Sequence, residues 1–162
     1  MKTTIRYIGL VFASLFLFVS FSSAQAKPHL LNVSTRAVAG SGENTLIIGF
    51  TTSPGSTSIR VLLRGVGPGL LPFGITTAIK TAKLQLFSGT TLLTTNLSWK
   101  SNIFDEATVR AANIAVGAFA LPDDGKDCAM VVFLQPGSPY TLQLSSLDGS
   151  TGPALIEVYE LP

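Results

Sequence analysis

Short apolar or alternating segments, separated by turn residues about every ten positions, run from residue 30 to the end of the chain. Alternation of apolar and polar residues is the pattern of a strand with one buried face. Such strands between Gly- and Pro-containing turns are typical of an all-β fold. We expect a single antiparallel β-sandwich of jelly-roll type with about eight or nine strands. The segments that predict strands are 30–36, 46–50, 58–64, 82–87, 91–95, 128–134, 140–145 and 154–159.

One segment, 103–115, has helical rather than strand spacing. Asn102 is a suitable residue to cap the start of a helix, and Gly117 is a suitable residue to end it. We expect a short helix that packs across one end of the sandwich through one apolar face. The residues expected on that face are Phe104, Ala107, Ala111 and Ile114.

The first 26 residues have the order of a cleaved export signal. Lys2 and Arg6 precede the charge-free apolar run Tyr7–Phe21, and a small-residue sequence of the A-x-A type ends at Ala26. The apolar run is shorter than the roughly 20 residues that a membrane-spanning helix needs. We therefore expect signal 1–26 to be removed, leaving one sandwich domain over 27–162. The protein is expected in the periplasm, at the cell surface or outside the cell, without membrane insertion.

The expected mature domain is apolar and electrically neutral. The whole chain has 46% hydrophobic and 12% charged residues, and two of its eleven Lys and Arg residues lie in the predicted signal. The nine basic residues that remain balance nine acidic ones, and they form no basic run. This balance argues against nucleic acid as a partner, because nucleic-acid binding needs a basic surface.

The residues that carry catalytic chemistry are few. His29 is the only histidine and lies close to the predicted mature N-terminus, where chains usually fray. Cys128 is the only cysteine, which excludes an internal disulfide, and its apolar neighbours indicate a buried side chain rather than a reactive thiol. A nucleophile needs a base held beside it, and the pattern supplies none. We expect no enzymatic activity and no cofactor.

One acidic cluster, Asp123, Asp124 and Asp127, is a candidate for metal binding. Hard cations such as Ca²⁺ need several oxygen ligands, and no downstream glutamate completes this set. Lys126, within the same segment, also opposes a cation. The alternative is a tight turn between strands, in which Asp and Gly serve the turn geometry. The sequence favours the turn.

Trp99, the only tryptophan, is the centre of the candidate ligand site. Carbohydrate-binding sandwiches commonly present an aromatic ring on which a sugar stacks, and Asn96 is a polar residue near it in sequence. The alternative is that the ring covers an open end of the core, as the usual high burial of tryptophan indicates. Arg64 is a candidate anion-binding residue together with other strand arginines, or a partner for a strand glutamate such as Glu157.

Several ordered strings run through essentially the whole expected mature chain. They include Leu31–Arg36 (LNVSTR), Leu46–Phe50 (LIIGF), Val61–Leu70 (VLLRGVGPGL), Gly117–Leu121 (GAFAL) and Thr151–Glu160 (TGPALIEVYE). As a set they resemble a β-sandwich repeat module of large secreted or surface bacterial proteins, present here as a single copy. That module has no established activity. The resemblance implies an extracellular accessory role and carries over no catalytic residue.

Two functions are expected from these observations. The first is a secreted, non-catalytic accessory module for adhesion or carbohydrate interaction, whose partner is a polysaccharide or another surface protein. The second is a structural component of the cell envelope or extracellular matrix that binds other protein modules. A carbohydrate-binding module is expected to show a concave polar patch with an exposed ring. A structural module is expected to show long apolar or unpaired strand edges.

Overall fold

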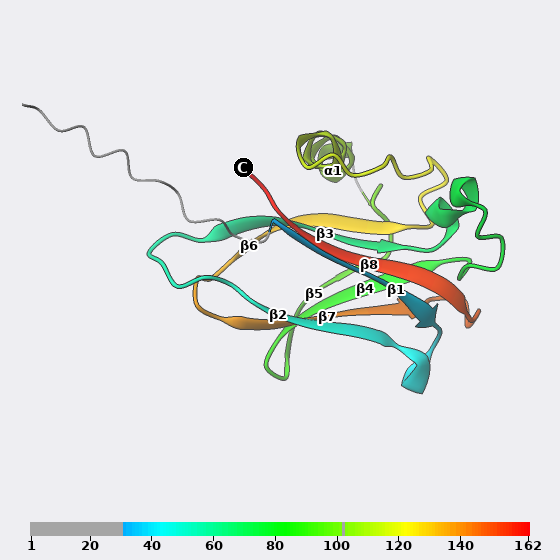
Figure 1. Cartoon of the computed structure of the whole chain (residues 1–162), viewed down its shortest axis with the longest axis horizontal. Helices are drawn as coiled ribbons and strands as arrows, with labels where there is room; N and C mark the ends of the chain where they lie inside the picture. Colours follow the sequence, from blue (N-terminus) through cyan, green and yellow to red (C-terminus); the bar gives the residue numbers. More distant parts are fainter. Residues whose placement is uncertain (1–30, 102) are drawn as a thin grey trace, which may run out of the picture.

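The described part of the chain folds into eight strands in two antiparallel sheets (Figure 1). The computed structural model describes residues 31–101 and 103–162, so the predicted signal 1–26, His29 and the helix cap Asn102 lie outside the described residues. Sheet A has the strand order β1-β8-β3-β6, and sheet B has the order β2-β7-β4-β5. The strands are β1 (Asn32–Ala39), β2 (Leu46–Thr51), β3 (Ile59–Val66), β4 (Ala82–Ser88), β5 (Thr91–Asn96), β6 (Cys128–Leu134), β7 (Pro139–Ser146) and β8 (Gly152–Glu160), and the loops include the 3₁₀ segments η1 (Gly42–Asn44) and η2 (Pro68–Phe73).

The strand pairs follow a jelly-roll arrangement. β1 pairs with β8, β2 with β7, β3 with β6 and β4 with β5, all antiparallel. The chain is therefore one long hairpin whose tip is the turn between β4 and β5. Successive pairs lie in alternate sheets, so the hairpin is rolled on itself. This topology confirms the predicted antiparallel sandwich of jelly-roll type.

Alternation along each strand separates the inter-sheet core from the outer faces. In β3, Val61 and Leu63 face sheet B, whereas Leu62 lies on the outer face of sheet A. Burying a leucine side chain contributes about 1.5–3 kcal/mol, so the leucine-rich strands of sheet B supply much of the stability. The largest fully buried members of the inter-sheet core are Leu63, Leu84, Leu86, Leu134, Leu142, Leu144, Ile79 and Ile156.

Helix α1 (Ile103–Ala115) has the predicted bounds but a different position from the one expected. It covers the outer face of sheet A as a third layer, over β3 and β6, instead of one end of the sandwich (Figure 1). It ends as predicted at Gly117, whose φ of +68° suits glycine. The amide N–H of Ala118 donates to the carbonyl of Asn113 at 2.9 Å, which satisfies the last turn of the helix.

The sequence predicted the wrong buried face for this helix. Ile114 is 82% exposed and Ala107 and Ala111 are also exposed, while the side chain of Phe104 is not among those described. The buried positions are Val109, Ala112 and the polar Asn113. The helical spacing of apolar residues does not predict this face, because it includes the polar Asn113, whose side chain accepts a hydrogen bond from the buried Arg64. The second core, between α1 and sheet A, contains Leu62, Val66, Leu70, Trp99, Val109, Ala112, Leu121, Ala129 and Leu161.

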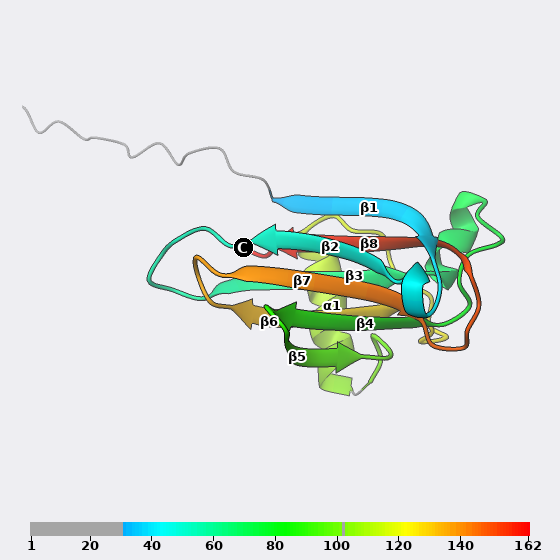
Figure 2. The same ribbon diagram turned by 90° about the horizontal axis from the view of Figure 1, so that it is seen from below.

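Four of the described strands lie at sheet edges. β1 and β2 run along one side of the sandwich, and β5 and β6 run along the opposite side (Figure 2). Within the described residues, no helix is both long enough and apolar enough to cross a membrane.

Candidate functional site

Trp99 lies inside the second core and is only 1% exposed. Its indole N–H donates to the carbonyl of Pro122 at 3.0 Å, and its backbone N–H donates to the carbonyl of Asp127 at 3.0 Å. The guanidinium carbon of Arg110 lies 4.6 Å from the centre of the ring and covers it. The interpretation of Trp99 as an exposed platform for sugars is therefore wrong. The ring has a covering role, as the alternative proposed, but over the outer face of sheet A.

Arg64 is fully buried beneath α1 and faces Glu157 directly across the β3–β8 ladder. Their Nε and Oε2 atoms are 3.2 Å apart, which bears out the ion-pair alternative. The Arg64 guanidinium also donates to Asn113 Oδ1 at 3.3 Å and lies 4.3 Å from the centre of the Phe119 ring. Burial lowers the pKa of Arg64, and Glu157 opposes that shift. A free anion has no route to this arginine, because its side chain is 0% exposed.

Glu157 also connects the buried ion pair to Ser34 of the edge strand β1 through a hydrogen bond. Its Oε1 accepts a hydrogen bond from the hydroxyl of Tyr159 at 2.7 Å and another from Ser34 at 3.4 Å. Burial, followed by the hydrogen bond to Glu157, raises the pKa of Tyr159 to about 12. A neutral hydroxyl is thus fixed on the carboxylate that neutralises Arg64.

We expect Tyr159 to keep its proton well above pH 10, the ordinary value of a tyrosine. Between pH 10 and about 12 the unfolded chain loses this proton while the folded chain holds it, so the stability of the fold decreases as the pH rises. Ultraviolet titration of tyrosinate checks the pKa, with Tyr159→Phe identifying the signal. A midpoint near pH 10 for Tyr159 in the folded protein would contradict the described hydrogen bond.

Asn96 lies at the end of β5, away from the Arg64 pair. It is 8% exposed, and its amide nitrogen donates to the carbonyl of Ser98 at 3.1 Å. It lines a cleft of about 260 Å³ beside β6 and the start of α1. The structure therefore does not bring Trp99, Asn96 and Arg64 together into one accessible site.

The three candidate metal ligands bind different groups of the protein. Asp123 pairs with Arg110 and Lys100, and Asp124 pairs with Lys126. Among the described residues, no group of three or more His, Cys, Asp and Glu side chains is placed to hold a metal ion.

Asp127 has a structural task instead. Its buried carboxylate accepts the amide N–H of Gly67 at 2.7 Å and that of Gly69 at 2.9 Å. A Cβ atom on Gly69 would lie 2.8 Å from the carboxylate, so this loop needs glycine. Burial raises the pKa of Asp127, and the two amide hydrogen bonds oppose that shift. The carboxylate therefore stabilises the loop after β3, a role that the sequence did not predict.

Cys128 is buried at the start of β6, as the sequence predicts, and its pKa is raised to about 12 by burial. Its thiol contacts the carbonyls of Ala82 and Asn96 at 3.2 and 3.1 Å. The thiolate is the reactive form, and burial keeps this thiol protonated and inaccessible. We therefore expect the folded protein to react with a disulfide reagent only as fast as it unfolds. Labelling in buffer and in denaturant compares the two states. Rapid labelling of the folded protein would contradict this burial.

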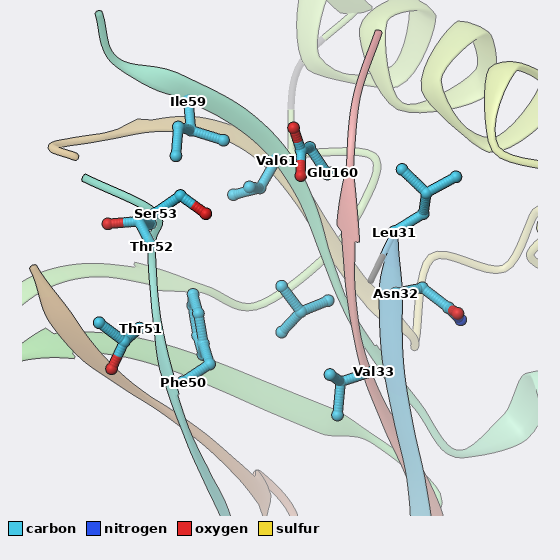
Figure 3. Close-up of a pocket in the computed structure, with 11 residues that line it drawn as sticks. Leu31, Asn32, Val33, Phe50, Thr51, Thr52, Ser53, Ile59, Val61 and Glu160 are labelled. Carbon is cyan, nitrogen blue, oxygen red and sulfur yellow. The ribbon is translucent and has the colours of Figure 1, made fainter. Parts of the chain in front are cut away.

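A cavity of about 490 Å³ opens between the two sheets at the end where β1 and β3 begin and β2 and β8 end (Figure 3). Figure 3 shows Phe50 of β2, Val33 of β1 and Val61 of β3 pointing into this space. Thr51 and Glu160 add polar groups to its lining. The volume lies within the range of about 300–1,000 Å³ that is usual for ligand pockets.

From β1 and the residue before it, only Leu31, Asn32 and Val33 line the cavity, so it lies where β1 begins. Farther along the same inward face, β1 carries the small side chains of Thr35 and Ala37, which pair with Ile156 and Ala154 of β8. Leu31, 60% exposed, lines the opening, while Val38 and Ile47 are exposed at the far ends of β1 and β2, at 64% and 53%. We call β1, β2 and the cavity between them the open side. It is an accessible concave surface of a size that fits a binding role.

None of the residues of the open side was among the predicted site residues. The strand pattern locates β1 and β2, but it does not predict which strands lie at the edges of the sheets. The available signal was the run of small and polar residues at inward positions of β1, where a central strand carries large apolar side chains.

No protein-family model matches the sequence, and no curated protein matches it. Among solved structures, the chain is similar to the pre-peptidase C-terminal domain of a collagenase from Bacillus anthracis, with a TM-score of 0.46 and 13% sequence identity. The alignment covers 79% of this chain and 89% of that one. A likeness this weak carries neither family membership nor function to this protein, so the resemblance to the secreted repeat module stays a prediction.

Proposed function

We propose that the protein is an exported, non-catalytic module that binds a segment of another protein along its open side. One observation carries the proposal: the apolar interior and an unpaired strand edge are accessible at the same place. Of the two functions expected from the sequence, this is the structural one, whose mark is an apolar or unpaired edge.

The edge of β1 has few of the features by which sandwiches protect themselves. Edge strands are usually short, interrupted by proline or rich in charge. β1 has eight residues, no proline and one charged residue, Arg36. Val38 of β1 and Ile47 of β2, the edge strand of the other sheet, expose large apolar side chains. A surface of this kind favours contact with another polypeptide.

Export and the lack of catalysis have their support in the chain itself. The predicted signal 1–26 supports export. Buried Glu157 and Asp127 are committed to Arg64 and to backbone amides, and Asp123 is paired with Arg110 on the surface. These carboxylates are therefore engaged in holding the fold, which supports a non-catalytic role.

Site-specific photo-crosslinking in the native host tests the proposal. A benzophenone amino acid at Val38, on the open side, is expected to give a discrete adduct with another protein. The same group at Ile114 of α1 is the matched control, because that side chain is 82% exposed but distant in the fold. Equal adducts at both positions, or none at Val38, would contradict binding along the open side.

Carbohydrate binding remains a second candidate, favoured by the outer face of sheet B. This face carries Gln85 opposite Gln143 and Thr95, and Phe87 opposite Thr141. The described helix lies on sheet A and leaves this face uncovered (Figure 1). Amide and hydroxyl groups around an aromatic ring are the contacts that a glycan chain uses.

Affinity electrophoresis in soluble polysaccharides tests this candidate. If a polysaccharide retards the protein, Phe87→Ala is expected to abolish the retardation, while Leu71→Ala, on the exposed η2 segment, is expected to leave it unchanged. Retardation that survives Phe87→Ala would place any glycan elsewhere.

A further inference from the structure

We propose that the partner binds the open side as an extended strand that pairs with the free edge of β1. Its inward side chains are apolar, those beside Leu31–Val33 enter the cavity, and a carboxylate on its outward face lies beside Arg36. This inference rests on the proposed function and specifies the form and chemistry of the partner.

The hydrogen bonds of β1 identify the groups that are free to pair. The N–H of Glu160 donates to the carbonyl of Leu31 at 2.8 Å, so Leu31 and Glu160 form a hydrogen-bonded pair with β8. In an antiparallel ladder such pairs recur at every second residue. Val33, Thr35 and Ala37 therefore direct their backbone groups to β8, according to the register. The backbone groups that point to the free edge belong to Asn32, Ser34, Arg36 and Val38.

The cavity lies beside Leu31 to Val33, at the start of β1, where the inward side chains of an added strand would meet it. A new strand beside β1 extends sheet A, and every second side chain on it faces the inside of the sandwich. There it meets Phe50 and Ile48 of β2, which are only partly buried. Phe50 is held in place by stacking on Tyr140, with ring centres 5.8 Å apart. The added strand thus completes a core that β1 leaves open.

Arg36 supplies the charge preference. It lies on the outward face of β1, is exposed, and among the described residues makes no ion pair. Opposite charges on neighbouring strands stabilise pairing, and like charges oppose it. A partner strand with Asp or Glu on its outward face is therefore favoured.

The same charge disfavours a second copy of this chain as the occupant. Suppose that two copies pair antiparallel through their β1 strands, with the inward faces aligned and the longest overlap. Arg36 of one copy then lies opposite Arg36 of the other, or diagonally next to it. That contact joins like charges on one face. The geometry points to a different segment, with alternating apolar residues and an outward carboxylate.

The probe for the test is a synthetic peptide with the sequence of residues 154–160, ALIEVYE. This sequence already pairs with β1 from its other side as β8, with Ala154, Ile156 and Val158 inward and Glu157 outward. We expect the labelled peptide to bind the purified protein in a fluorescence polarisation assay. Glu157→Lys in the peptide should weaken binding about two- to fivefold, and Arg36→Glu in the protein should reverse that preference.

Backbone pairing is tested separately from side-chain contact. Methyl groups on the amide nitrogens of Ile156 and Glu157 block both edges of the peptide and leave its side chains unchanged. We expect this peptide to lose binding by more than about tenfold, because the ladder hydrogen bonds are removed. In the protein, Val38→Pro removes one free-edge N–H and should weaken binding, while Val38→Thr keeps it and should not. Melting curves confirm that both variants fold.

The outcomes distinguish the claim of strand addition from the broader claim that a partner binds along the open side. Binding that survives methylation but is lost on Val33→Asp would overturn strand addition and leave the open side as a binding site. No binding of the peptide, with adducts still formed at Val38, would also overturn strand addition alone. A dimer of the purified protein that Val38→Pro dissociates would make a second copy the occupant. Absence of both peptide binding and adducts would overturn the proposed function as well.

Discussion

Trp99→Ala is expected to lower the melting temperature by about ten degrees or more. The indole ring is 1% exposed, and its N–H is satisfied by the carbonyl of Pro122. Removing a buried tryptophan leaves a cavity in the second core and costs about 3–5 kcal/mol. On a domain of this size each kcal/mol shifts the midpoint by roughly three to six degrees. Thermal unfolding followed by circular dichroism measures the effect.

Leu71→Ala is the matched control for that measurement. Leu71 is 61% exposed on η2, so its removal should change the unfolding free energy by no more than about 0.5 kcal/mol. A melting temperature for Trp99→Ala within a few degrees of the unchanged protein would contradict the burial of the ring. That result would also support the earlier interpretation of Trp99 as a ligand platform.

Glu157→Ala is expected to destabilise the fold by about 3–5 kcal/mol, because it leaves the charge of Arg64 buried without its partner. The guanidinium lies beneath α1 with a side-chain exposure of 0%, so water does not replace the carboxylate. Its remaining contacts are the amide oxygen of Asn113 and the ring of Phe119. Denaturant unfolding gives the free energy of each variant.

The double variant Arg64→Met, Glu157→Met separates the charge from the packing. Replacing both members of a buried pair by apolar side chains is often neutral or stabilising, because the desolvation cost disappears with the charges. We therefore expect the double variant to be more stable than Glu157→Ala. If the double variant were as unstable as the single one, packing rather than charge would explain the loss.

The strands and the helix bounds were predictable from the sequence because local rules decide them. Alternation in β3 and a glycine after α1 leave one consistent assignment for each element. The jelly-roll topology also followed, since the regular spacing of strands and turns favours it.

The side-chain environments were less predictable, because they depend on which elements cover which face. Nothing local in β3 shows that α1 lies over Arg64, so its burial is a consequence of tertiary packing. The same layer buries Trp99. The helix face containing Ile114 was misassigned because Asn113, a polar residue, is the one that turns inward to Arg64.

The open side could not be located from the sequence for a related reason. Whether Val33 and Phe50 border a cavity depends on β1 and β2 being edge strands, each with one neighbour among the described strands, and this is a property of the sheet order. A strand pattern describes the residues of one strand, and a free edge belongs to the whole sheet.

Site-resolved amide hydrogen exchange along β1 tests the central claim most directly, because that claim is an unpaired and accessible edge. We predict alternation in the protein alone: the amides of Ser34, Arg36 and Val38 exchange fast, whereas those of Thr35 and Ala37, bonded to β8, exchange slowly. Adding the ALIEVYE peptide should slow the first group and leave the second unchanged. Uniform protection of all five amides in the protein alone would show that the edge is already covered and would contradict the account.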